Sequence, residues 1–298
     1  MRSSREYQKL LNAPGDFLWQ TVSPKRRRTA SVTESIGGNE HLYKRLFCCV
    51  VILSFSLSLA AQSSPAPKKA DIDPGAMATL NKMGAYLRTL NAFQVKSVQT
   101  TDDVLDNGQA IQSDSVVDVL AVRPNRLRVE IKSDDKHRLL LYNGKSFTMF
   151  GQLVNYYATV PAPPTIGELI DKLDEKYGIE MPLVDLFMWG TPQSDAEKQI
   201  TSAIDVGPSS VDGTSCEQYA FRQDGLDWQV WIQQGDYPLP RKLILTTLID
   251  DARPRHTQLL TWNLAPSFND AAFTFEPPKD AQKITIAEVT ASASDEKK

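Results

Sequence analysis

Hydrophobic and polar side chains alternate along much of the chain after residue 92, which is the spacing of β-strands that bury one face. The clearest case is the segment 126–132, where Leu127, Val129 and Ile131 alternate with charged residues. Such a pattern predicts a strand with one buried face and one face in water. Similar segments recur towards the C-terminus, so the chain is expected to be mainly β.

Short turns separate these segments. Asp106-Asn107-Gly108 and Asn143-Gly144 are strong hairpin signals, because Asn and Gly accept positive φ angles. About ten strands joined in this way predict an antiparallel sheet, and so many strands in an open sheet are expected to curl and form a concave side. The predicted strands are 93–105, 115–122, 126–132, 137–142, 146–150, 153–160, 204–206, 215–222, 228–233, 241–249, 256–264 and a short one near 284–286.

Helical spacing occurs before the first strand. Residues 71–90 carry apolar side chains three and four positions apart, and Asp73 can cap a helix ahead of Pro74. A helix with one apolar stripe needs a sheet to pack on. The stripe consists of Met77, Leu80, Met83, Leu87 and Leu90.

A long insertion separates the two groups of strands. Pro161, Pro163 and Pro164 end the first group, and helical stretches are predicted at 165–177, 182–189 and 193–200. The N-terminal helix and this insertion are the elements expected to cover the concave side of the sheet. The predicted fold class is therefore α+β, mainly β, with a single large curved antiparallel sheet.

The segment 44–60 has the features of a secretory signal peptide. Lys44 and Arg45 precede an uncharged apolar run, and the small residues Ser58 and Ala60 suit cleavage after Ala60. Fifteen apolar residues would span about 22 Å as a helix, which is short for a membrane core of about 30 Å, so a retained anchor is the alternative. We expect a periplasmic protein.

The other boundaries follow from composition. Residues 1–43 form a polar leader, which is either an extended signal flank or the product of a translation start assigned too far upstream. Residues 61–73 are expected to be a linker, 74–288 the folded β domain and 289–298 a flexible tail.

Charge and cysteine content exclude some classes of function. After residue 60 the chain has 24 basic and 32 acidic residues, a balance of −8 that disfavours nucleic-acid binding. Cys216 is the single cysteine in this part, so no disulfide can form within it, and a buried, inert thiol is expected.

Catalytic and metal motifs are missing from the sequence. His137 and His256 stand at strand starts, Cys216 has no partner cysteine for zinc, and no nucleophile elbow or phosphate-binding loop occurs. We expect no cofactor, no metal and no enzymatic activity. Acidic residues could instead serve a hydrolase, although they also favour turns and solvated helix faces. They are Asp102, Asp103, Asp134, Asp135, Asp250, Asp251, Glu168, Asp171 and Glu175.

Aromatic, aliphatic and methionine side chains suggest an apolar cavity instead. Such side chains line adaptable apolar sites, and they also fill ordinary cores. The candidates for a ligand cavity are Phe147, Met149, Leu186, Phe187, Met188, Trp189, Trp228, Val230 and Trp262.

Three short motifs resemble those of a family of periplasmic proteins of unknown function. They are Val122-Arg123-Pro124 leading into 127–131, the turn Tyr142-Asn143-Gly144-Lys145, and the Phe-x-Phe-x-Pro-Pro sequence at 273–278. The family looks like a relative of the lipoprotein localisation factors of Gram-negative bacteria, and the resemblance covers approximately residues 74–288. It implies a half-open β-barrel with helices as a lid, which carries acyl chains on its concave face without catalysis.

These observations favour a periplasmic carrier or sensor for a lipid, a lipoprotein or another apolar molecule, with transient membrane contact. The alternative is a structural or assembly partner for other envelope proteins, without a small ligand. A hydrolase that uses Asp102, Asp103 or Asp134 is the third class.

Overall fold

The computed structural model describes residues 72–105, 107–183 and 196–288. The leader, the signal segment, nearly all of the linker, Asp106, residues 184–195 and the tail lie outside the described residues, together with the predictions made for them. Neither described helix is long and apolar enough to cross a membrane.

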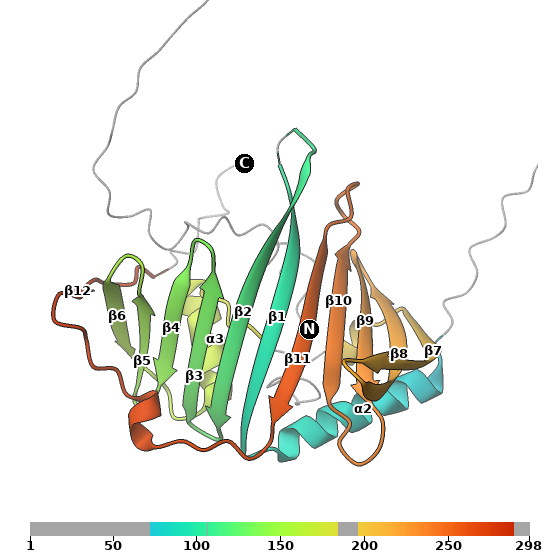
Figure 1. The fold of residues 1–298 in the computed structure, drawn as a ribbon, viewed down its shortest axis with the longest axis horizontal. Coiled ribbons are helices and arrows are strands. Elements are labelled where there is room, and N and C mark those ends of the chain that lie inside the picture. The colour runs from blue at the N-terminus through green and yellow to red at the C-terminus, as the bar shows by residue number, and fades with distance from the viewer. Residues whose placement is uncertain (1–71, 106, 184–195, 289–298) are drawn as a thin grey trace, which may run out of the picture. The chain divides into compact units, whose positions relative to one another are not determined.

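A single twelve-stranded sheet organises the described residues, as Figure 1 shows. Its strands follow the order β12-β6-β5-β4-β3-β2-β1-β11-β10-β9-β8-β7. All neighbours pair antiparallel except β12 and β6, which pair in parallel. The strands are β1 (Ala92–Val104), β2 (Ala110–Val122), β3 (Arg126–Ser133), β4 (His137–Tyr142), β5 (Ser146–Gly151), β6 (Tyr156–Pro161), β7 (Ser202–Val211), β8 (Thr214–Gln223), β9 (Leu226–Gln233), β10 (Pro240–Thr247), β11 (Arg255–Asn263) and β12 (Gln282–Lys283).

The predicted antiparallel sheet is confirmed, with corrections at the ends of several strands. β2 begins at residue 110, not 115, and β7 continues to residue 211, well past the predicted end at 206. Residues 152–155 form the turn before β6, where a strand was predicted from residue 153. The last strand is β12, two residues earlier than predicted and parallel to its neighbour.

The two groups of strands meet in the middle of the sheet. β1 pairs with β11 over eight residue pairs, from Gln94 with Asn263 to Thr101 with His256. β6 and β7, which flank the insertion in sequence, therefore lie near opposite ends of the strand order. The insertion has to connect these two ends, which explains its length.

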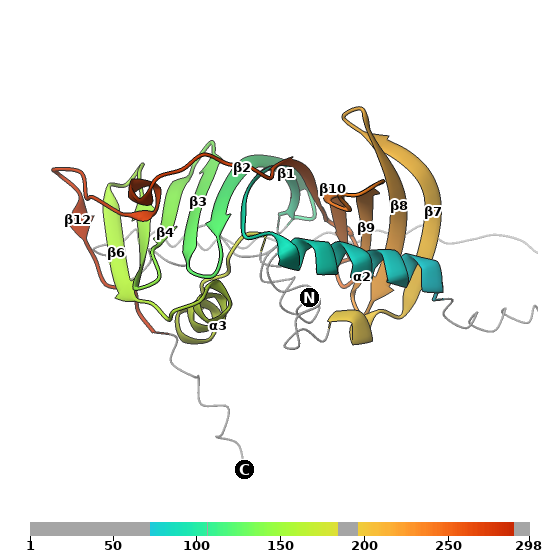
Figure 2. The same cartoon turned by 90° about the horizontal axis from the view of Figure 1, so that it is seen from below.

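Both helices lie on one face of the sheet. Directly paired residues point to the same face, so Phe93, Ala121, Leu127 and Tyr142 form one row. The Tyr142 hydroxyl donates to the carbonyl of Pro163, just before α3. The Tyr219 hydroxyl, on the same face of β8, donates to Thr79 Oγ1 of α2 over 3.2 Å. Figure 2 shows both helices on this side of the curved sheet, called here the concave face.

The two helices have the predicted caps. α2 (Pro74–Thr89) begins after Asp73, whose carboxylate accepts hydrogen bonds from the amides of Gly75 and Ala76. α3 (Ile166–Tyr177) begins after Thr165 and ends at Gly178, which has a φ of 61°. The third predicted stretch contains the short 3₁₀ helix η1 (Ala196–Gln199). The buried helix residues are Ala76, Leu80, Met83, Gly84, Leu87, Ile166, Leu169, Ile170, Leu173 and Tyr177.

After β11 the chain crosses the opposite, convex face as a strap, residues 264–288 (Figure 2). The strap contains the 3₁₀ helix η2 (Asp270–Phe273) and then the Phe275 ring, which packs on Phe150 and Tyr157 with centroids 5.3 and 5.0 Å apart. β12 then pairs with β6, and Glu288 forms an ion pair with Lys176 of α3 over 2.9 Å. The strap therefore binds the convex face, one edge and a helix of the concave face together.

Candidate functional site

Five of the nine candidate cavity residues lie on the concave face. Phe147 and Met149 project from β5, and Trp228 and Val230 from β9, and all four are buried. Trp262 of β11 is half-buried on the same face. The other candidates, Leu186, Phe187, Met188 and Trp189, lie outside the described residues.

The structure places these five residues in separate groups. Seven strand spacings separate β5 from β9, or roughly 34 Å along the sheet at about 4.8 Å per spacing. Trp262 lies between them, with its ring 5.6 Å from that of Phe93 and its Nε1–H donating to the carbonyl of Pro240. The candidates thus share one broad face and do not form one compact cluster.

The group around Phe147 lies on the α3 side of the sheet. Tyr142 is paired with Phe147 across β4 and β5, and both side chains are fully buried. Burial, reinforced by the charge of Glu168, raises the pKa of Tyr142 to about 12. The hydroxyl therefore stays neutral and acts as a hydrogen-bond donor to the chain before α3.

The group around Trp228 lies on the α2 side. The Trp228 ring stacks on Phe221 with centroids 4.2 Å apart and an interplanar angle of 21°. Phe221 in turn lies next to Tyr219, which contacts α2 through Thr79. Burial is the largest cause of the raised pKa of Tyr219, so this group is also uncharged at neutral pH.

Further apolar side chains connect the two groups, and none of them was among the candidates from the sequence. Val95, Val119, Val129 and Leu140 are paired in a row from β1 to β4, and all are buried. The row continues to Met149 of β5. Their alternation with polar residues was visible in the sequence, but their common row depends on the strand register. The concave face is thus apolar across its centre.

Polar side chains occupy the part of the same face that lies towards the β1–β2 hairpin. We define the polar belt as six uncharged residues of β1, β8, β10 and β11. They are Ser97, Gln99, Gln223, Thr247, His256 and Gln258. Sequence reasoning missed five of them, because a polar strand residue is usually assigned to the wet face.

The hydrogen bonds of Gln99 within the belt are long. Its amide nitrogen donates to Ser97 Oγ over 3.3 Å, and Ser115 Oγ donates to its amide oxygen over 3.4 Å. Typical hydrogen bonds of these types are near 2.8–3.0 Å. Gln99 is nevertheless 8% exposed and Ser97 0%. These groups are buried with weak hydrogen bonds and have capacity for a better partner.

His256 is neutral in the belt. The amide nitrogen of Gln258 donates to its Nε2 over 2.9 Å, so Nδ1 carries the proton and donates to Thr101 Oγ1 over 2.7 Å. Burial lowers the pKa of His256 to about 4, and protonation of Nε2 would also break the bond from Gln258. The imidazole therefore contributes no charge to the concave face at neutral pH.

This lowered pKa predicts a pH dependence of stability. The unfolded chain protonates His256 near pH 6.5 and the folded chain only near pH 4, so stability is complete above pH 6.5 and falls as the pH drops towards 4. We expect a loss of about 2 kcal/mol, allowing for screening of a half-buried group. Urea unfolding at pH 7 and pH 4.5 measures it, and His256→Gln should abolish this part of the loss. An unchanged loss in His256→Gln would contradict the assignment.

Two belt residues are buried without hydrogen-bond partners among the described residues. Both polar atoms of the Gln223 amide and the hydroxyl of Thr247 are in this position, although the side chains are only 2% and 4% exposed. Leaving a buried polar group unpaired costs about 1–3 kcal/mol. Such groups need an explanation, and a ligand that supplies the missing hydrogen bonds is one.

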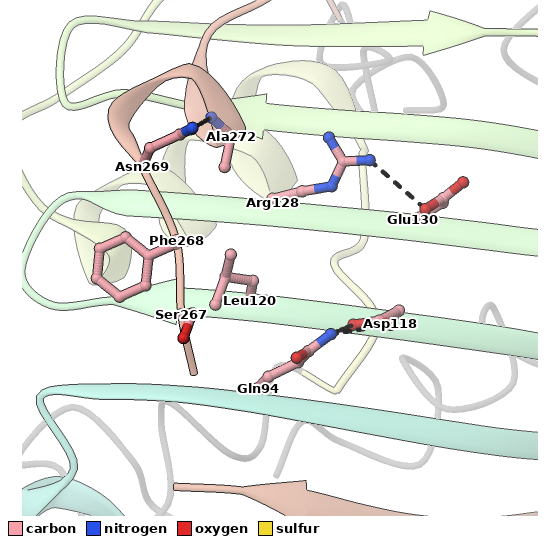
Figure 3. A pocket seen from close by; sticks show the side chains of 9 residues that line it. All are labelled: Gln94, Asp118, Leu120, Arg128, Glu130, Ser267, Phe268, Asn269 and Ala272. Carbon is pink, nitrogen blue, oxygen red and sulfur yellow. Dashed lines mark hydrogen bonds and ion pairs between the residues drawn. The ribbon is translucent and has the colours of Figure 1, made fainter. Parts of the chain in front are cut away.

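A cleft of about 630 Å³ lies on the convex face, between the strap and β1–β3 (Figure 3). Leu120 forms part of its floor, and Phe268 lies beside the floor on the strap. Its polar groups are Gln94, which donates to both carboxylate oxygens of Asp118, and Arg128, 3.5 Å from Glu130. The remaining lining residues are Ser267, Asn269 and Ala272.

The charged groups of the cleft are already paired. Burial alone would raise the pKa of Glu130, but hydrogen bonds from Lys132 and His137 and the charges of Lys132 and Arg128 lower it to about 2. A carboxylate with two cationic neighbours, Lys132 and Arg128, and a hydrogen bond from His137 is a structural ion cluster. We therefore interpret the cleft as the space between strap and sheet, and the concave face as the better candidate for a ligand site.

The acidic residues considered for catalysis take part in local structure. Asp102 and Asp103 lie within β1, not in a turn, and accept hydrogen bonds from Gln112 and Ser113 on β2. Asp250 caps its own turn through the amide of Ala252. Among the described residues, no group of three or more His, Cys, Asp or Glu side chains is placed to hold a metal ion. The hydrogen bonds of Asp102, Asp103 and Asp250 thus stabilise the local strand and turn structure.

Cys216 is buried as expected. It belongs to a small apolar cluster on the convex face with Val211 and Trp231. Burial raises the pKa of its thiol, which favours the unreactive protonated form.

Solved structures with similarity to this chain share little of its sequence. LprF from Mycobacterium bovis is 13% identical, over 71% of this chain and 100% of LprF, with a TM-score of 0.39. A LolA superfamily protein from Nitrosomonas europaea is 12% identical, over 67% of this chain and 97% of that one, with a TM-score of 0.31. The complex of MucA and MucB from Pseudomonas aeruginosa is 17% identical, over 67% of this chain and 61% of that one, with a TM-score of 0.37. The comparison with curated proteins gave no match.

The family comparison covers most of the folded chain. The family described as "Predicted periplasmic protein (DUF2092)" matches residues 76–287, nearly the whole segment on which the resemblance was based. The chain belongs to this family, which confirms both the resemblance and the periplasmic location expected from the sequence.

Proposed function

We propose that this protein is a non-catalytic periplasmic carrier that holds a lipid or acyl chain on its concave face. The observation that supports the proposal most directly is the width of the apolar concave face relative to the two described helices that lie on it. The uncharged state of Tyr142, Tyr219 and His256 at neutral pH agrees with an apolar ligand.

The helices extend over only part of the sheet. Twelve strands at about 4.8 Å per spacing give a sheet about 50 Å wide. α2 lies across the strands and, with 16 residues, is about 24 Å long, whereas α3 runs along the strands and is about 10 Å wide (Figures 1 and 2). Roughly 15 Å of the apolar face therefore lies beyond the two described helices, a width that matches one or more extended acyl chains.

The expected affinity follows from apolar burial. Each buried methylene contributes about 0.8 kcal/mol, so ten methylenes contribute about 8 kcal/mol before the cost of ordering the chain. This gross figure sets an upper limit on the affinity, a dissociation constant near 1 μM, which the ordering cost weakens. Such an affinity allows uptake and release, as a carrier requires.

A partner protein could instead bind the open edge of the sheet, as an envelope assembly protein would require. β7 is an edge strand, and Ile204 and Val206 on it are exposed. However, the strand has an irregular register between Asp205 and Gly207, followed by Pro208. Bulges and prolines protect edges from pairing with other chains. The edge strand therefore supports an assembly role less strongly than the concave face supports a carrier role.

Two adjacent residues of β10 test the proposal. Leu243 faces the concave side and Ile244 the convex side, and both are half-buried. With the fluorescent apolar dye N-phenyl-1-naphthylamine, we expect saturable binding that Leu243→Gln weakens at least fivefold and Ile244→Gln leaves unchanged. Absence of dye binding, or equal effects of both variants, would count against a ligand site on the concave face.

A further inference from the structure

The polar belt makes the concave face amphipathic along the direction of the strands. On β1, Phe93 and Val95 are apolar, and the next two residues of the same face are Ser97 and Gln99. On β11 the same face changes from Trp262 and Leu260 to Gln258 and His256. Apolar residues therefore lie towards the end of the sheet that holds the β2–β3 turn, and polar residues towards the β1–β2 hairpin (Figure 1).

The belt extends over four strand spacings, or about 19 Å, from β1 to β8, so one polar group of a ligand can reach neighbouring members of the belt. Gln99 and Gln258 are directly paired across β1 and β11. Thr247 lies diagonally from His256 across β10 and β11, at a distance of about 7–8 Å. Gln223 extends the belt to β8, two strands beyond Thr247.

We propose that the belt binds the uncharged, hydrogen-bonding part of an amphiphile, such as an ester, amide or hydroxyl group, while its chain lies on the apolar half. This inference rests on the proposed carrier function and specifies its substrate class. The amide of Gln223 and the hydroxyl of Thr247, both more than nine-tenths buried, have no partner among the described residues. A ligand with both donors and acceptors would pair them, and a pure hydrocarbon would not.

The charges near the belt disfavour an anionic headgroup. All six belt side chains are neutral at pH 7, since His256 donates and accepts as a neutral imidazole. Arg138 is the arginine in the same cross-strand row as Ser97, and it is three strands away, or about 14 Å. A carboxylate or phosphate in the belt would be desolvated with no cation of the described residues beside it, which is costly.

Competition with the bound dye tests the substrate class. The three probes are 1-monooleoylglycerol, which has an uncharged polar head, oleate, which has an anionic head, and 1-octadecene, which has no head. We expect the monoglyceride to displace N-phenyl-1-naphthylamine at concentrations at least tenfold below those of the other two. Equal displacement by all three would overturn the belt proposal and leave the carrier function standing, whereas no displacement by any would overturn both.

Two threonine variants test whether the belt causes the preference for the monoglyceride. Thr247→Val removes an unpaired buried hydroxyl, so it should raise the midpoint of urea unfolding and yet reduce the preference for the monoglyceride about fivefold. Thr148→Val removes a buried hydroxyl of the convex face that is hydrogen-bonded to Thr159, so it should lower the midpoint and keep the preference. An unchanged preference in Thr247→Val, with the fold intact, would refute the role of the belt.

Discussion

Replacement of Phe147 by alanine is expected to lower the free energy of unfolding by about 3–5 kcal/mol. The Phe147 ring is 0% exposed and lies on the concave face, paired with Tyr142 of β4 and Val160 of β6. Its removal takes a large apolar surface out of the core and leaves a cavity that neighbouring strands cannot close. Urea unfolding of the exported protein, followed by tryptophan fluorescence, measures the change.

Val98→Ala provides the matched control for this prediction. Val98 belongs to the same sheet but faces the convex side, where it is 45% exposed. Its truncation should change the free energy of unfolding by no more than about 0.5 kcal/mol. A loss below 1 kcal/mol in Phe147→Ala would show that the α3 side of the concave face is loosely packed, contrary to the structure.

Phe273→Ala is expected to have the second large effect, because it loosens the strap. Phe273, the last residue of η2, is buried, with the Phe268 ring 5.7 Å away and the Arg126 guanidinium 6.0 Å from its own ring. Arg126 also forms an ion pair with Asp270 of the same turn. Loss of the ring should lower the free energy of unfolding by about 3–5 kcal/mol, largely because the strap is held less firmly on the sheet.

Limited trypsin digestion detects a detached strap. Lys279 and Lys283 lie in the strap after Phe273, so cleavage there should become at least tenfold faster in Phe273→Ala under native conditions. Phe268→Ala is the control, because that ring is exposed and its loss should change cleavage much less. Equal cleavage rates in the parent protein and Phe273→Ala would contradict the role given to this residue.

Local patterns were sufficient to predict much of this fold. Asp73 and Pro74 marked the start of α2, and Asn143-Gly144 marked the β4–β5 turn, where Gly144 has a φ of 84°. The alternation of Leu127, Val129 and Ile131 correctly predicted β3 and its buried face. These features depend on neighbouring residues, which is why they could be inferred from the sequence.

The features that the sequence did not reveal depend on long-range pairing. β12 has two residues and pairs with a strand more than a hundred residues earlier, so the sequence placed this strand two residues too late and did not reveal its parallel pairing. The path of the strap over the convex face was also not predicted, although its Phe-x-Phe-x-Pro-Pro motif was noticed. Phe273 and Phe275 anchor the strap to the convex face, which accounts for the phenylalanines of that motif.

The candidate site was predicted only in part, because it also depends on long-range strand pairing. Phe147 and Trp228 were identified as large apolar residues, but only the strand order shows that they lie on separate flanks of one face. His256 was noted only as a residue at a strand start, and Gln223 and Thr247 were not considered at all. Their burial on the concave face follows from register across β8 to β11, which no local pattern encodes.

The concave face is expected to be wider than its two described helices require and to hold an amphiphile in the remaining width. Native mass spectrometry of the protein, purified from the periplasm without detergent, tests this most directly. We expect a fraction of molecules heavier by the mass of one uncharged acyl amphiphile, which collisional activation releases and solvent extraction recovers. A single ligand-free mass, with no lipid in the extract and none taken up from added 1-monooleoylglycerol, would contradict it.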